Sequence, residues 1–237
     1  MSTLYIVATP IGNLSDISQR ALATLEMVDV VAAEDTRHTG ALLSHFGMKK
    51  RLVSCHQQNE MASSQGIIKL LDEGMNVAFC SDAGTPGVSD PGARLVEEVR
   101  NNTGHDIVPI PGPSAFVTLL SVAGSIPKSY VFEGFLPQKS GKRRKRLEAL
   151  FALSMPFFIY ESPYRVVKCL SDIASISPDA TCVMGRELTK EFEEIRKESA
   201  SSLLSYLEGK DQVKGEFVIL VIPGGEGDDN AQEDQEP

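Results

Sequence analysis

The strongest constraint on the fold is a regular alternation of short apolar runs and longer amphipathic stretches in the first half of the chain. The apolar runs predict strands at 4–8, 28–33, 52–55, 77–81 and 107–110. The amphipathic stretches predict helices at 15–26, 37–46, 63–73, 89–101 and 113–123. Because a helix follows every strand, this order predicts an N-terminal, mostly parallel sheet flanked by helices.

A second set of elements begins after the turn at 124–127. Its strands are expected at 130–135, 156–161, 180–185, 193–199 and 216–222. Its helices are expected at 142–153, 163–176 and 201–208. We therefore expect a two-domain α/β protein, with an N-terminal domain at 1–124 and a mixed α/β C-terminal domain at 125–223. Residues 224–237 are acidic and poor in apolar side chains, which predicts a disordered tail.

Three loops of the first half share a composition rich in glycine and proline. They occupy 9–13, 81–92 and 109–114, and each follows a predicted strand. In a parallel sheet the carboxyl ends of the strands lie on one edge, where small ligands bind. A fourth loop of this kind, at 133–137, is expected to face them across a cleft between the domains. The alternative for 81–92 is an ordinary turn between a strand and a helix. None of the loops matches a dinucleotide or phosphate-loop motif, which disfavours those ligands.

The charge of the chain is uneven. The formal net charge is −9, but six of the acids lie in the tail, and the remaining 26 acids face 23 bases. Six bases fall within eight residues at 139–146. Such a run predicts a contact with a polyanion, and its alternative is a solvated helix face.

Two further features concern the cellular setting. No apolar run approaches the length of about 20 residues that a membrane span requires, and no export signal follows Met1, so a cytoplasmic protein is expected. Cys55, Cys80, Cys169 and Cys182 lie in or beside apolar runs without a Cys-x-x-Cys pair. They are expected to be reduced core thiols, with no metal site.

The motifs of these loops resemble those of a known family. The loops at 9–13, 81–92 and 109–115, followed by Gly-x-Ile-Pro at 124–127, resemble the tetrapyrrole methylase superfamily. Seven motifs resemble its branch that methylates a ribose 2′-hydroxyl of ribosomal RNA: TPIGNL at 9–14, EDTR at 34–37, HQQNE at 56–60, SDAGTP at 81–86, YESPYR at 160–165, RELTK at 186–190 and KGE at 214–216. The tetrapyrrole enzymes carry Gly-x-Gly-x-Gly and Gly-Asp-Pro where this chain has Thr-Pro-Ile-Gly-Asn and Ser-Asp-Ala, which disfavours a tetrapyrrole substrate.

The resemblance implies two α/β domains that hold S-adenosylmethionine between them, in a homodimer. It implies methylation of a cytidine in the decoding centre of 16S ribosomal RNA, with that RNA or the small ribosomal subunit as the partner. By position, the residues lining the cofactor would be Pro10, Gly12, Ser81, Asp82, Ala83, Gly84, Ser114 and Ala115.

Methyl transfer to a ribose hydroxyl needs in-line placement and removal of one proton. The matching motifs offer four catalytic candidates, Glu34, Arg37, His56 and Lys190. The alternatives are a satisfied histidine at a strand end for His56, and a capping turn with a local ion pair for 34–37. The residues expected to bind RNA phosphates are Lys142, Arg143, Arg144, Lys145, Arg146, Arg165 and Arg186.

Two other functions remain open from the sequence. One is a methyltransferase of the same fold that acts on a tetrapyrrole or on a protein side chain, as in diphthine synthesis. The other is a non-catalytic RNA-binding factor that kept the fold. Binding of S-adenosylhomocysteine would separate the enzymes from the binding factor.

Overall fold

The computed structural model describes residues 1–56 and 60–224, and these form two compact units that divide between Ala115 and Phe116. The expected domain boundary lies at 124/125, whereas the contacts divide the chain between Ala115 and Phe116. Helix α5 (Ala115–Val122) therefore belongs almost entirely to the second unit. Nearly all of the expected tail, together with positions 57–59, lies outside the described residues.

The first unit contains one parallel sheet. Its strands are β1 (Thr3–Val7), β2 (Val30–Ala33), β3 (Arg51–Ser54), β4 (Val77–Cys80) and β5 (Asp106–Ile110). They lie in the order β3-β2-β4-β1-β5, and every neighbouring pair is parallel. The helical segments are η1 (Leu14–Asp16), α1 (Gln19–Met27), α2 (Thr36–His45), α3 (Glu60–Asp72) and α4 (Ala93–Asn102).

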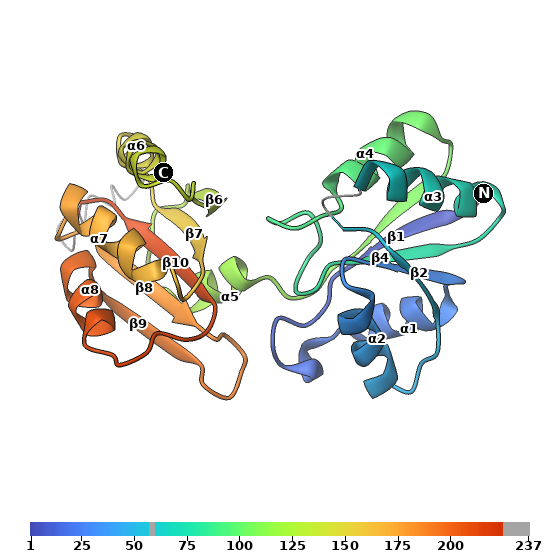
Figure 1. Ribbon diagram of the computed structural model, residues 1–237, viewed down its shortest axis with the longest axis horizontal. Helices are drawn as coiled ribbons and strands as arrows, with labels where there is room; N and C mark the ends of the chain where they lie inside the picture. The colour runs from blue at the N-terminus through green and yellow to red at the C-terminus, as the bar shows by residue number, and fades with distance from the viewer. Residues whose placement is uncertain (57–59, 225–237) are drawn as a thin grey trace, which may run out of the picture. The chain divides into compact units, whose positions relative to one another are not determined.

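Helices cover both faces of this sheet, as the alternating pattern predicts. Figure 1 shows α1 and α2 on one side of the strands and α3 and α4 on the other. Leu25 of α1 packs in one core cluster with Val31, and Leu71 of α3 packs in another with Phe79. Strands β2 and β4 are buried at every position because they are central and covered on both sides.

The second unit contains a mixed sheet. Its strands are β6 (Val131–Phe135), β7 (Phe157–Glu161), β8 (Thr181–Arg186), β9 (Glu194–Ser199) and β10 (Phe217–Ile222). They lie in the order β6-β7-β10-β8-β9, where β6 and β7 are parallel and the other pairs antiparallel. The remaining helices are α6 (Ser140–Phe151), α7 (Val166–Ile176) and α8 (Ala200–Glu208).

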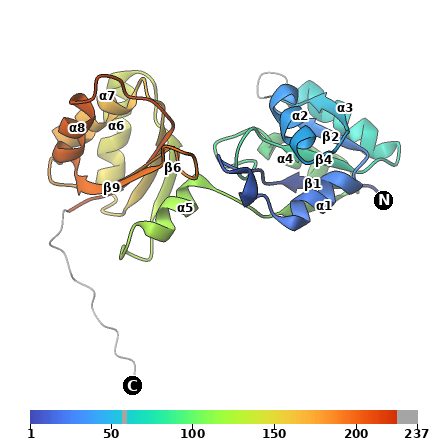
Figure 2. The same cartoon turned by 90° about the horizontal axis from the view of Figure 1, so that it is seen from below.

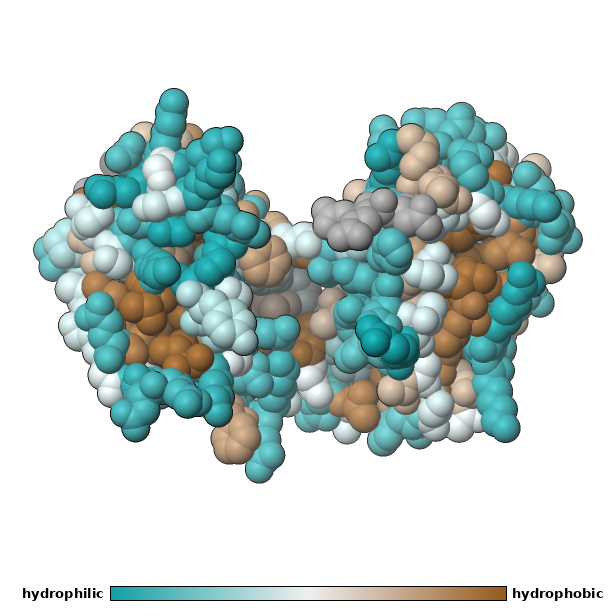
Figure 3. Space-filling view, viewed as in Figure 1, coloured by the Kyte–Doolittle hydropathy of each residue, from teal (hydrophilic) through white to brown (hydrophobic). Residues whose placement is uncertain are grey.

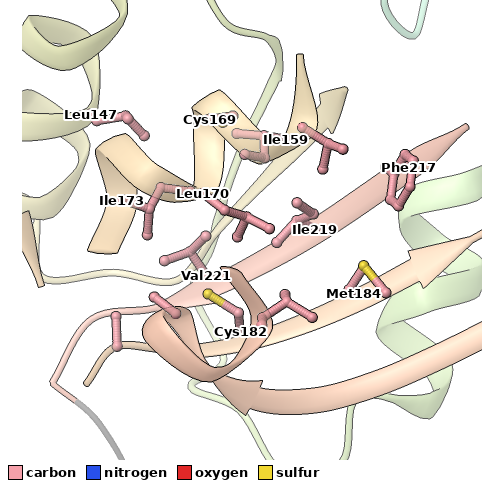
Figure 4. Packing of buried hydrophobic residues seen from close by; sticks show 14 of the residues in the cluster. Leu147, Ile159, Cys169, Leu170, Ile173, Cys182, Met184, Phe217, Ile219 and Val221 are labelled. Carbon is pink, nitrogen blue, oxygen red and sulfur yellow. The ribbon is translucent and has the colours of Figure 1, made fainter. Parts of the chain in front are cut away.

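The two faces of the second sheet are covered unequally. Figure 2 shows α6, α7 and α8 together on one side and α5 on the other. On the first side, Figure 4 shows Leu170 of α7 and Cys182 of β8 pointing into a shared apolar cluster with Ile219 of β10. On the other side, the Phe116 ring of α5 lies 5.7 Å from the ring of Phe158.

The α/β fold class and the two sheets agree with the sequence prediction, while several helix ends differ. The helix expected at 15–26 is split into η1 and α1 because Ser18 caps the second part, accepting a hydrogen bond from Ala21 N–H. The helix expected at 89–101 begins at Ala93, after Gly92, which has a φ of 122° that favours glycine.

All four cysteines are free and buried, as predicted for core thiols. Burial raises the pKa of Cys80 to about 12, so its thiol stays protonated and behaves as a small core residue. Among the helices of the described residues, none is long and apolar enough to cross a membrane.

Candidate functional site

The three glycine-rich loops meet at the carboxyl edge of the first sheet. Thr9 and Gly84 exchange two backbone hydrogen bonds of 2.9 and 3.1 Å, which join the loop after β1 to the loop after β4. The hydroxyl of Thr85 donates to the carbonyl of Pro113 at 3.0 Å, which joins the second loop to the third. A Cβ on Gly112 would lie 2.9 Å from the Cβ of Ala8, so this approach requires glycine. These bonds bring together the loops that carry the expected cofactor residues.

Two carboxylates from neighbouring strands lie beside these loops. Glu34 follows β2 and Asp82 follows β4, and the backbone N–H of Asp82 donates to Glu34 Oε2 at 3.2 Å. In return, Asp82 Oδ1 accepts a hydrogen bond of 3.0 Å from Asp35 N–H. Burial raises the pKa of Glu34, and the charges of Asp82 and Asp35 add to this effect, against the hydrogen bond from Asp82 N–H. This shift of the Glu34 pKa is in the direction that suits a proton-accepting carboxylate.

Asp35 and Arg37 form a capping turn with a local ion pair, which is the alternative that the sequence left open. Asp35 is the N-cap of α2, and its Oδ1 accepts from Arg37 N–H at 2.8 Å. The Arg37 guanidinium donates to Asp35 Oδ2 at 2.7 Å while its side chain remains 90% exposed. The hydrogen bond to Asp35 raises the pKa of Arg37, so Arg37 is a cation at the rim and unsuited to proton removal.

His56 follows β3 and is exposed. Because β3 is parallel to β2, this residue lies at the same edge of the sheet as Glu34. Three of its motif neighbours, Gln57, Gln58 and Asn59, lie outside the described residues.

A second group of motifs meets at one edge of the other sheet. Phe217, the first residue of β10, is in register with Glu161 at the end of β7 and with Arg186 at the end of β8. This pairing brings together the motifs at 160–165, 186–190 and 214–216, which are distant in sequence. Close to this edge, Lys190 Nζ lies 2.9 Å from Glu187 Oε1 and 2.8 Å from Glu216 Oε2.

The two carboxylates keep Lys190 protonated. Partial burial lowers the pKa of Lys190, but the hydrogen bonds to Glu216 and Glu187 outweigh it and raise the pKa above 10.5. A lysine that acts as a base needs the opposite shift, so Lys190 is unsuited to remove a proton from the ribose hydroxyl. The sequence does not single out Glu216; the available signal is its place beside glycine in the short KGE motif at a strand start.

The predicted RNA-binding arginines are largely engaged within the protein. Arg143 is buried, and its Nε donates to Asp172 at 2.7 Å. Arg146 donates to Glu133 at 2.7 Å. Arg165 donates to the carbonyl of Leu136 at 2.7 Å and pairs with Glu161. Arg186 pairs with Glu194 at 3.2 Å.

The basic helix α6 therefore divides into two faces. Figure 3, in the view of Figure 1, shows a hydrophilic surface over α6. Lys142, Arg144 and Lys145 are exposed there and form no ion pair with any residue in 1–56 or 60–224. Arg143 lies on the buried face with Leu147 and Leu150. Lys139, the first base of the run, is also exposed and forms no ion pair within the described residues, so these four side chains carry the free charge of the run.

No metal-binding cluster of three or more histidine, cysteine, aspartate or glutamate side chains occurs among the residues that the structure describes. The carboxylates at the first edge are instead engaged with backbone N–H groups. This arrangement suits the binding and proton-accepting roles that the sequence proposes for them.

Comparisons with known proteins agree with this architecture. The family profile described as "Tetrapyrrole (Corrin/Porphyrin) Methylases" matches residues 3–204. The chain is 46% identical to a protein named "Ribosomal RNA small subunit methyltransferase I" from Escherichia coli O157:H7, over 92% of this chain and 77% of that protein. It is also 46% identical to the protein of that name from Borrelia garinii subsp. bavariensis, over 92% of this chain and 97% of that protein.

A solved structure of the methyltransferase CobJ has a TM-score of 0.72 with this chain at 15% identity, covering 94% of this chain and 95% of that one. At this identity the likeness concerns the fold alone. Together with the family profile and the relatives, the two sheets and their glycine-rich edge show that this chain belongs to the tetrapyrrole (corrin/porphyrin) methylases and is a methyltransferase.

Proposed function

We propose that this protein transfers the methyl group of S-adenosylmethionine to the ribose 2′-hydroxyl of a cytidine in the decoding centre of 16S ribosomal RNA. The observation that carries the proposal is the joined loop edge with its Glu34 and Asp82 carboxylates, in a chain 46% identical to relatives named for small-subunit ribosomal RNA methylation. Such an enzyme would act in the cytoplasm as a homodimer. The exposed apolar side chains of Val117 and Val122 on α5 support a contact between copies.

The loop edge fits S-adenosylmethionine, which would supply the electrophilic methyl group. The cofactor carries an ammonium and two ribose hydroxyls, and Asp82 offers a carboxylate for either. Gly84 and Gly112 keep the loop backbones free of side chains, and the loops at 9–13, 81–84 and 114–115 would line the cofactor. Glu34 would accept the proton of the ribose hydroxyl, since its raised pKa favours the protonated product.

Replacement of Asp82 by alanine is expected to weaken binding of S-adenosylmethionine by about 10- to 150-fold, because hydrogen bonds to a charged group contribute about 1.5–3 kcal/mol. Asp82→Asn keeps an oxygen that can accept from Asp35 N–H, while it removes the charge. Isothermal titration calorimetry on both variants separates the two contributions. Wild-type affinity in both variants would contradict the assignment of Asp82 to the cofactor.

The exposed side of α6 is expected to contact RNA phosphates. Changing Lys142, Arg144 and Lys145 together to glutamine should lower the slope of log Kd against log salt concentration by about 2, at about 0.7 for each phosphate contact on a single strand. The matched control changes three exposed bases elsewhere, Lys49, Lys69 and Arg100. An equal change of slope in both triple variants would argue against a specific role for α6.

The function itself is tested by mass spectrometry of ribose-methylated cytidine in 16S ribosomal RNA from cells that lack the gene. One 2′-O-methyl mark should be absent, and it should return with the wild-type gene but not with Asp82→Ala. An unchanged methylation pattern would overturn the proposal. A thermal shift with S-adenosylhomocysteine would then favour a tetrapyrrole or protein substrate, and its absence would favour a non-catalytic RNA-binding factor.

A further inference from the structure

Tyr164 is an aromatic side chain whose exposure the fold does not explain. Tyr164 lies in the turn between β7 and α7 and is 90% exposed, whereas large apolar surfaces are normally buried. The turn is held by hydrogen bonds from Arg165 N–H and Val166 N–H to the carbonyl of Ser162, at 3.1 and 3.0 Å. Arg165 is further anchored to Leu136 and Glu161. These contacts therefore hold the backbone of the turn that carries the exposed Tyr164 ring.

A groove of about 500 Å³ lies against this ring. Its lining residues are Pro163, Tyr164, Gln212, Val213, Lys214 and Gly215. The two lining segments adjoin because β7 ends, and β10 begins, at the paired positions Glu161 and Phe217 (Figure 1). The groove thus results from the sheet register and combines an aromatic ring, an amide and an ammonium group.

Lys214 supplies a charge that no residue in 1–56 or 60–224 neutralises. Its side chain is exposed, and it forms no ion pair or hydrogen bond within the part of the chain that the structure describes. Lys190, by contrast, is held by Glu187 and Glu216. An anion entering the groove would therefore find Lys214 available.

Gly215 connects the groove to the Lys190 cluster. It has a φ of 96°, and a Cβ at this position would lie 2.4 Å from the Cγ of Glu187. Glu187 Oε1 in turn accepts from Glu216 N–H at 2.9 Å. Gly215, which lines the groove, thus packs directly against Glu187, one of the two carboxylates that hold Lys190.

We propose that this groove binds one nucleotide of the RNA substrate other than the methylated one, with its base stacked on Tyr164 and its phosphate at Lys214. The inference rests on the proposed function, because it requires an RNA substrate. Aromatic stacking beside a cation is the usual way in which proteins hold single-stranded RNA without reading its sequence. Gln212 can donate to or accept from a base edge within the same groove.

The first test is steady-state kinetics with small ribosomal subunits that lack the methyl mark. Tyr164→Ala should raise the KM for the subunit by about 5- to 150-fold, the range expected for the loss of one stacked base, with a smaller change in kcat. Tyr164→Phe keeps the ring and should restore the KM. A KM for Tyr164→Ala within twofold of the wild-type value would overturn the proposal. An unchanged KM together with an altered molecular mass of that variant in light scattering would also overturn it.

The second test uses the absence of tryptophan from the chain. In Tyr164→Trp the new indole is the sole tryptophan fluorophore, and a 16S ribosomal RNA fragment containing the target cytidine should quench it. The control is Met27→Trp, an exposed position at the end of α1, where no quenching is expected. RNA binding without quenching at Tyr164→Trp would overturn the groove assignment. If the proposed methyltransferase function is wrong, the wild-type protein leaves the RNA unmethylated. If only the groove assignment is wrong, the wild-type protein methylates the RNA, but the RNA does not quench Tyr164→Trp.

Discussion

Glu34→Gln is expected to reduce kcat by about 10²- to 10⁴-fold, the range that a positioned proton acceptor contributes. Glutamine is nearly isosteric with glutamate and can still accept the hydrogen bond from Asp82 N–H, so the loop geometry should remain. It cannot take up the proton of the ribose hydroxyl. Single-turnover kinetics with saturating cofactor and RNA measures this step. Glu26→Gln, which changes an exposed glutamate of α1, should have wild-type kcat.

The pH dependence gives an independent check on Glu34. Burial raises its pKa in the folded protein, so wild-type activity should fall on the acid side as Glu34 becomes protonated. For stability the sign is fixed by linkage: the contribution of Glu34 is present below its ordinary pKa of 4.5 and is lost as the pH rises through the raised value. Glu34→Gln should therefore unfold at the same or a higher temperature than wild type at pH 7. An inactive variant that is also less stable would argue for a structural role instead.

Asp172→Ala is expected to lower the free energy of unfolding by about 3–5 kcal/mol, because it leaves the buried Arg143 guanidinium without its carboxylate. The two side chains are 6% and 13% exposed, and Arg143 Nη2 lies 2.7 Å from Asp172 Oδ2. The remaining contact of Arg143, to the carbonyl of Gln138, is 3.5 Å long. Urea unfolding of the variant and of the wild-type protein measures the loss.

The double variant Arg143→Met/Asp172→Leu should recover much of that stability, because it removes both charges and keeps the volume apolar. Recovery should be incomplete, since the positive charge of Arg143 also favours the ionised form of the buried Glu161. Arg165 remains to pair with Glu161. If Asp172→Ala lowers the free energy of unfolding by less than about 1 kcal/mol, the Arg143–Asp172 pair contributes no more than a surface ion pair does. That result would contradict the burial of the pair.

The basic run on α6 illustrates what sequence patterns can and cannot resolve. Its six bases appear as one patch, yet Arg143 faces the core and Arg146 is held by Glu133. A signal was available in the spacing of Arg143, Leu147 and Leu150, which places all three on one face of a helix. The partner of Arg143 lies in α7, 29 positions away, and its identity required the packing of two helices.

The sequence by itself determined the order and type of the elements, the parallel first sheet and the edge where its loops lie. These follow from the period of apolar residues and from the alternation of strands and helices, both of which are local properties. Only the tertiary structure decided which polar groups meet. Glu34 bonds to Asp82 across two neighbouring strands, and Lys190 reaches Glu216 through the pairing of β8 with β10. Strand order and register set these distances, and the pKa values follow from the burial and the charges that result.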